Sequence, residues 1–258
     1  MSELAPRRGG LLADTAALTA RSTRISTRNP DAVLVSLLMP VLLMVVFVHL
    51  FGGAIDTGTE YVAYVTPAVL VLCAGYGASM TAQSVTFDMA QGVVDRFRSM
   101  DVGAVPFLGG HVAASAARNA VAVLAVVGAA ALMGFRAAGS PLGWLAAAGL
   151  LLAWIVALSW LAACVGLVAK SPEGAGGFGF FLLFLPYPSS GFVPIETMPG
   201  WLRGFAEHQP ATPLIESVRA LLLGEPAGGA VWRTLAWCFG ILVCSVALSG
   251  VVFRRRSR

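Results

Sequence analysis

Five long apolar segments and a shorter sixth one constrain this chain more than any other feature of its sequence. The long ones cover approximately residues 32–51, 61–85, 107–135, 142–169 and 231–253, and the shorter one covers residues 177–193 and contains two prolines. A hydrocarbon core of about 30 Å requires about 20 apolar residues in a helix. A backbone in lipid must satisfy its own hydrogen bonds, and the alternating pattern of a β-barrel is not present. We therefore expect an all-α polytopic membrane protein with six transmembrane helices.

Composition agrees with a lipid-embedded chain and indicates its orientation. Hydrophobic residues make up 57% of the sequence, charged residues make up 12%, and the mean hydropathy is +0.80. If the six segments alternate in direction, 12 of the 17 Lys and Arg residues lie on one side, and these cations resist translocation. An excess of Arg over Lys, with much Ala and Gly, is typical of a GC-rich bacterial gene. We expect a bacterial cell (inner) membrane protein with both termini in the cytoplasm, a transmembrane domain at 32–253 and a basic cytoplasmic end at 254–258.

The cytoplasmic N-terminal tail, residues 1–31, shows a helical pattern and no signal-peptide pattern. Leu11, Leu18 and Ile25 recur every seven residues, and three arginines share the adjoining face until Pro30 ends the pattern. Such a helix would lie in the inner-leaflet interface and bind membrane lipids through apolar burial and anionic headgroups. A disordered basic tail is the alternative, because Thr and Ser are frequent here.

Several kinds of chemistry have no motif in this sequence. No HExxH or CxxC spacing is present to hold a metal, no Gly-rich loop precedes the single lysine, Lys170, to bind ATP, and no basic patch with interleaved aromatic residues suggests nucleic acid. We expect no metal, cofactor or nucleic acid on this chain. The glycines of GYGASM, residues 75–80, lie inside an apolar segment and predict close helix packing rather than dinucleotide binding.

Three polar side chains fall within the expected spans. Arg118 and Asn119 lie in the third span, and His49 lies near the outer end of the first. Ionisable groups at membrane depth are costly, so each should face protein or water. For Arg118 two alternatives stay open: it lines a path or pairs with a carboxylate, or it extends to the inner surface.

The connection between the second and third spans, residues 86–106, carries charges interleaved with apolar side chains. This pattern fits a short amphipathic helix on the cytoplasmic side, where soluble partners are found. A solvated connecting loop is the simpler alternative.

Residues 192–224 separate two apolar segments and contain four prolines. Thr212-Pro213 is a good helix start and Gly224 a good stop, which gives only about 16 Å of helix, half a bilayer. With a preceding helix at 198–205, we predict a re-entrant helix pair that dips into the outer leaflet and lines an outward opening. Glu216 and Arg219, three residues apart, could pair. The alternative is a loop that rests on the outer surface without a gating role.

The segments FDMAQGVVDRFRSM and FVPIETMPGWLRGFAEHQPATPLIESVRALLLG resemble the coupling segment and the external signature of ABC-2 type permeases. The resemblance is strongest to the daunorubicin-resistance-type drug exporters, and it covers the whole chain in layout. It implies a six-helix membrane subunit, acting as a homodimer, without catalytic residues of its own. A separate ABC ATPase subunit would bind ATP and Mg and drive transport.

The resemblance also implies roles for two groups of residues. Coupling to the ATPase would involve Asp88, Gln91, Gly92, Asp95, Arg96, Phe97, Arg98, Ser99 and Met100. The external gate would involve Phe192, Pro194, Met198, Pro199, Trp201, Leu202, Glu216 and Arg219. The expected function is export of an amphipathic drug-like or lipid-like molecule. Export of a lipid-linked glycan by the same fold is the first alternative, and a motor-independent carrier or a membrane enzyme is the second.

Overall fold

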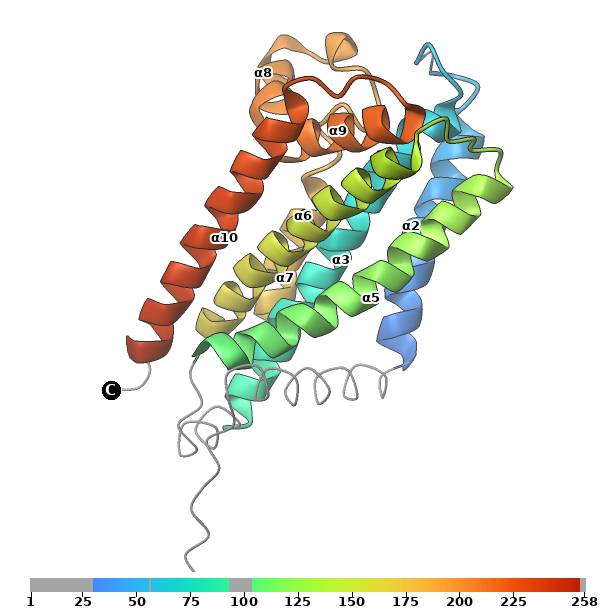
Figure 1. Ribbon diagram of the computed structural model, residues 1–258. Coiled ribbons are helices and arrows are strands. Elements are labelled where there is room, and N and C mark those ends of the chain that lie inside the picture. The colour runs from blue at the N-terminus through green and yellow to red at the C-terminus, as the bar shows by residue number, and fades with distance from the viewer. Residues whose placement is uncertain (1–29, 56, 93–103, 256–258) are drawn as a thin grey trace, which may run out of the picture.

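The computed structural model describes residues 30–55, 57–92 and 104–255, and this part of the chain is a bundle of helices (Figure 1). The predicted interfacial helix of residues 1–31 lies almost wholly outside the described residues. The elements are α2 (Pro30–Phe51), α3 (Tyr61–Ala90), α5 (Ala104–Leu132), α6 (Pro141–Val168), α7 (Pro172–Phe184), the 3₁₀ turn η1 (Ile195–Thr197), α8 (Gly200–His208), α9 (Ala211–Leu223) and α10 (Ala230–Arg255).

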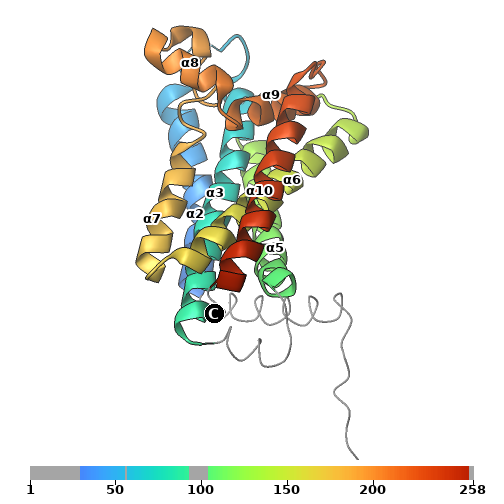
Figure 2. The same cartoon turned by 90° about the vertical axis from the view of Figure 1, so that its left-hand side faces the viewer.

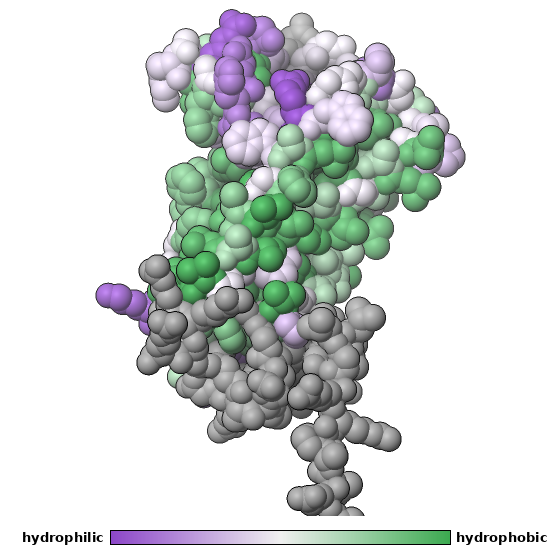
Figure 3. All heavy atoms as spheres, turned by 60° about the vertical axis from the view of Figure 1, so that its left-hand side comes forward, coloured by the Kyte–Doolittle hydropathy of each residue, from purple (hydrophilic) through white to green (hydrophobic). Residues whose placement is uncertain are grey.

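Five of these helices, α2, α3, α5, α6 and α10, are long and apolar enough to cross a membrane. Helix α3 is buried along most of its length, and α2, α5, α6, α7 and α9 pack against it. By contrast, α2 and α10 leave most of their apolar side chains exposed. Figure 3 shows hydrophobic side chains over the middle of one face of the molecule, with a more hydrophilic end above them. This surface is that of a protein whose outer faces contact lipid.

The fifth predicted span in chain order, residues 177–193, does not form one continuous helix. Helix α7 begins earlier, at Pro172, where Ser171 accepts a hydrogen bond from the amide of Gly174, and it ends at Phe184. Its 13 residues rise about 20 Å, and the following residues form turns because Pro186 and Pro188 lack the amide donors that a helix requires. The chain nevertheless passes from the end of the bundle where α6 ends to the opposite end, where α8 lies (Figures 1 and 2). We call α7 together with residues 185–194 the broken crossing.

Close packing around α3 confirms the interpretation of GYGASM as a packing motif. A Cβ atom at Gly77 would lie 1.9 Å from the amide nitrogen of Asn119, so only glycine lets α5 approach here. Asn119 is buried and donates to the carbonyl of Ser115 over 3.0 Å, and the Ser115 and Ser159 hydroxyls lie 2.9 Å apart. The Ser115 hydroxyl also lies 3.4 Å from the carbonyl of Gly77, so these polar side chains join α3, α5 and α6 within the bundle.

The described ends of the chain lie on one side of the bundle. Helix α2 starts and α10 finishes at the end opposite to α8 and α9 (Figure 1). This arrangement requires an even number of passages through the bundle, which the five long helices and the broken crossing provide.

Candidate functional site

The helices α8 and α9 and the turn η1, which together we call the cap, cover one end of the bundle (Figure 2). Helix α9 packs against α3, α6 and α10 and buries most of its apolar side chains. It ends at Gly224, whose φ of +76° is a left-handed conformation that glycine adopts readily. The two short helices predicted at 198–205 and 212–224 are therefore present within a few residues of their predicted bounds. Their depth in a membrane stays a prediction.

In the non-helical part of the broken crossing, backbone carbonyls accept hydrogen bonds from side chains. The hydroxyl of Tyr61 donates to the carbonyl of Phe192 over 3.1 Å, and Gln209 Nε2 donates to the carbonyl of Pro188 over 2.6 Å. The carbonyl of Pro186 accepts from the hydroxyl of Ser189. A buried carbonyl without a donor costs free energy, so these side chains allow the chain to leave the helix inside the bundle.

Arg219 of α9 supplies the most extensive of these contacts. Its Nη2 donates to the carbonyl of Ser190 over 2.6 Å and to the carbonyl of Tyr64 over 3.0 Å, and Nε contacts the same Tyr64 oxygen at 3.3 Å. Its Cζ lies 3.8 Å from the centroid of the Tyr64 ring, which is a cation–π contact. Burial lowers the pKa of the Arg219 guanidinium. One side chain thus joins the cap, α3 and the broken crossing.

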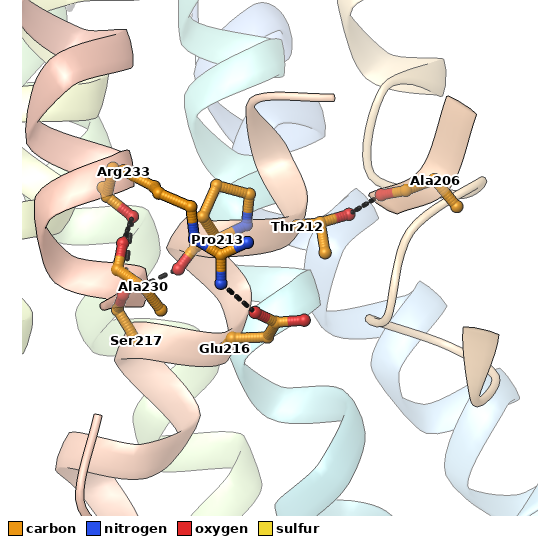
Figure 4. Close-up of polar contacts among 8 residues, drawn as sticks. Ala206, Thr212, Pro213, Glu216, Ser217, Ala230 and Arg233 are labelled. Atoms are coloured by element: carbon orange, nitrogen blue, oxygen red, sulfur yellow. Dashed lines mark hydrogen bonds and ion pairs between the residues drawn. The ribbon is translucent and has the colours of Figure 1, made fainter. Parts of the chain in front are cut away.

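The expected pair between Glu216 and Arg219 was wrong, because Arg219 is engaged with backbone oxygens. Glu216 Oε2 instead lies 3.5 Å from Arg233 Nη2 of α10, and Figure 4 shows this contact between the two helices. Burial raises the pKa of Glu216, although Arg233 and Arg219 act in the opposite direction. The same helices are joined nearby by the hydroxyls of Ser217 and Thr234, 3.4 Å apart.

A cavity of about 310 Å³ lies beside this contact, and charged groups of both signs line it: Glu216, Arg219, Glu225 and Arg233. Helix α8 is attached to α9 by the hydroxyl of Thr212, which donates to the carbonyl of Ala206 over 2.5 Å (Figure 4). The cap is therefore held to the bundle by polar contacts as well as by apolar packing.

The predicted gate residues differ in their exposure, and their role in gating stays a prediction. Phe192 is buried under the cap, whereas Trp201 is 80% exposed on α8. Pro199 is also exposed, and Pro194, Met198 and Leu202 are partly buried. The sequence interpretation missed Tyr61, Tyr64 and Gln209, whose only signal was a polar group at the edge of an apolar segment.

Aromatic rings form a row along the broken crossing and the adjoining end of α2. Successive ring centroids lie 4.5–5.7 Å apart, and the row comprises Phe180, Phe184, Tyr187, Phe192, Phe47 and Phe51. Phe180 and Phe184 are 60% and 51% exposed, so this part of the row is open to the surroundings of the bundle.

At the opposite end, the structure describes three of the predicted coupling residues. Gln91 is exposed and Gly92 has a φ of +66°, whereas Asp88 is buried and lies against His111 of α5. A buried side chain cannot form a docking surface, so the expected role of Asp88 as a direct contact does not fit its position. The remaining coupling residues lie outside the described residues: Asp95, Arg96, Phe97, Arg98, Ser99 and Met100.

The intramembrane polar residues have different surroundings. His49 Nδ1 lies 2.9 Å from the carbonyl of Val45 on its own helix and is exposed. Arg118 is partly buried and lines a small cavity together with Asn119 and Tyr76. Both alternatives for Arg118 stay predictions.

The fold and the polar contacts define a multi-pass helical membrane protein with one interrupted crossing and a helical cap. Comparison with known proteins gives the family: residues 13–223 match the model of the ABC-2 type transporter, and the chain belongs to this family.

Two curated relatives are similar over most of their length. The chain is 31% identical over 222 residues to the daunorubicin resistance ABC transporter permease protein DrrB1 of Streptomyces coeruleorubidus, covering 85% of this chain and 78% of the relative. It is 25% identical over 269 residues to the probable doxorubicin resistance ABC transporter permease protein DrrC of Mycobacterium tuberculosis, covering 99% of this chain and 96% of the relative. The resemblance recognised in the two motifs is thereby confirmed.

Proposed function

We propose that this chain is the membrane permease subunit of an ABC exporter, which moves an amphipathic drug-like or lipid-like molecule outward. The observation that carries the proposal is the match to the ABC-2 family over 13–223, together with relatives that are named as drug-resistance permeases. A separate ATPase subunit would supply ATP hydrolysis with Mg, and the permease would work as a homodimer. The cap end would face outward, and both termini would lie in the cytoplasm.

The surface of the bundle supports a substrate that enters from lipid. Apolar side chains cover the outer faces of α2 and α10, and the aromatic row continues this surface to the edge of the cap. An amphipathic molecule partitions into the bilayer before it reaches such a surface. Carbonyls of the broken crossing accept hydrogen bonds from side chains, which can exchange partners. Neighbouring helices could therefore separate at this point with little loss of helical backbone hydrogen bonds.

Purification from the native membrane in mild detergent tests the proposal. A soluble protein with a P-loop should co-purify in fixed stoichiometry, and the substrate should stimulate its ATP hydrolysis. The absence of such a partner, in a preparation that keeps the permease dimer, would support a self-sufficient carrier or an enzyme instead.

The coupling segment gives a second test. The double variant Arg96→Ala and Phe97→Ala should abolish transport without affecting insertion into the membrane. The matched control is Arg136→Ala with Phe239→Ala, which removes the same residue types at exposed positions. A coupling variant that transports at the full rate would refute this assignment.

Export of a lipid-linked glycan is the second candidate, and the aromatic row is the observation that favours it. Rings presented in a continuous series bind sugar faces as well as planar drugs. Stimulation of ATP hydrolysis by lipid-linked oligosaccharides, but not by planar amphiphilic drugs, would select this candidate.

A further inference from the structure

A buried acid–base pair joins the two helices that flank residues 93–103. Asp88 lies in the last turns of α3 and His111 in the second turn of α5. His111 Nε2 and Asp88 Oδ2 are 3.2 Å apart, and their side chains are 7% and 6% exposed. The distance is within the range of an ion pair, although the geometry does not meet the criteria of a hydrogen bond.

Apolar side chains from three helices surround this pair. The Phe107 ring meets the His111 ring edge to face, with centroids 5.1 Å apart. The neighbouring cluster comprises Val85, Phe107, Leu108, Val112, Trp160, Ala163 and Leu167. Because both side chains are nearly buried, removal of either partner would take away a contact between α3 and α5 in surroundings where polar contacts are strong. The pair is therefore sensitive to any movement that separates α3 from α5.

Helix α3 is attached to α6 at the same level. Thr86 Oγ1 lies 3.0 Å from the carbonyl of Gly166, and a Cβ atom at Gly166 would lie 2.6 Å from the carbonyl of Ala82. The backbones of α3 and α6 thus touch here, and α6 cannot move independently of α3. The pair of Asp88 and His111 adds α5 to this unit.

We propose that Asp88 and His111 are positioning residues that make α3 and α5 move together when a motor protein displaces the segment between them. The inference rests on the proposed function, in which an ATPase binds this segment. The chain leaves α3 through Gln91 and Gly92, and the left-handed turn at Gly92 gives no regular helix through which a force could reach α3. The side-chain pair supplies a direct connection between the flanking helices, so a displacement tilts both helices rather than bending the last turn of α3.

The experiment uses the full permease with its co-purified ATPase in proteoliposomes. The variants are Asp88→Asn, His111→Gln and the exchange of Asp88→His with His111→Asp. Matched controls are Glu173→Gln, which replaces a carboxylate by an amide, and His208→Gln, which makes the same change as His111→Gln; both positions are exposed. Three quantities are measured: the amount of assembled complex, the rate of ATP hydrolysis, and the number of substrate molecules transported per ATP.

Each single variant should assemble in amounts, and hydrolyse ATP at rates, near those of the parent. The number of substrate molecules transported per ATP should fall about fivefold or more. This factor is within the usual range of interaction energies between side chains in contact. The exchanged pair should recover most of this ratio, because it restores the two groups in reversed order.

A variant with an unchanged transport ratio would overturn the proposal. Loss of assembly or ATP hydrolysis in parallel with transport would also overturn it, because the pair would then be purely structural. Failure of the proposed function is a separate result: the parent complex would then show no ATP-dependent transport.

Discussion

Removal of the Arg219 side chain should open the broken crossing locally. The carbonyls of Ser190 and Tyr64 both accept from its guanidinium, and both residues are buried. A hydrogen bond to a charged group contributes about 1.5–3 kcal/mol, and the cation–π contact adds about 0.5–2 kcal/mol. Because water at the edge of the bundle replaces part of these interactions, we expect Arg219→Ala to lower the local opening free energy by about 2–4 kcal/mol.

Arg219→Lys should cost about half as much, because an ammonium group lacks the planar fork that reaches two carbonyls at once. Hydrogen–deuterium exchange of the amides of residues 185–194 measures this quantity directly. A loss of about 2–4 kcal/mol corresponds to exchange roughly 30 to 900 times faster in that segment. A peptide from α6 serves as an internal reference.

Arg203→Ala is the matched control. Arg203 pairs with Glu207 over 2.9 Å on the exposed surface of α8, and such surface pairs contribute little. Exchange in residues 185–194 should not change in this variant. Protection in Arg219→Ala that equals that of the parent would refute the assignment of Arg219 as the main connection between the cap and the broken crossing.

Two further predictions concern stability in detergent. Gly77→Ala should destabilise the protein by about 1–3 kcal/mol through overpacking against Asn119. Gly128→Ala, where no atom lies near the added Cβ, should be neutral or stabilising. The thermal inactivation of the two variants measures this difference in stability. Glu216→Gln should remove a pH dependence of the protein's stability. Burial raises the pKa of Glu216 in the folded protein. The contribution of this carboxyl to the free energy of unfolding is therefore fully present below its unfolded pKa and is lost as the pH rises through its folded pKa. Inactivation temperatures of the parent should therefore fall between mildly acidic and neutral pH relative to Glu216→Gln, and parallel curves would contradict the burial of this carboxyl.

The sequence predicted the long helices because apolar length alone determines them. It failed at α7, where the apolar residues continue through Pro186 while the helix ends at Phe184. Hydropathy counts side chains and takes no account of the missing amide donors of proline. The start and end of α9 were predicted well, since Pro213 and Gly224 act through local backbone conformation.

The partners of the polar side chains could not be predicted in the same way. Arg219 and Tyr64 are 155 positions apart, and nothing local to either residue indicates the other. The same holds for Asp88 and His111, because Asp88 lies in the connection between two spans, His111 lies within the third span, and nothing local to either residue indicates the other. The expected pair of Glu216 with Arg219 was wrong for this reason: helical spacing brought the two residues near each other, but buried backbone oxygens offered Arg219 stronger partners.

Helix α3 has polar contacts with other elements at both of its ends, so it connects the two ends of the molecule. One end of α3 is attached to the cap through Arg219 and Tyr64, and the other is attached to α5 through Asp88 and His111. Between these contacts the helix is buried against α5, α6 and α7, so it cannot bend without loss of packing. In the mechanism proposed above, a displacement at the Asp88 end would reach the cap as a movement of α3 as a whole. The broken crossing is the part that can yield, because its carbonyls depend on side chains of the cap and of α3.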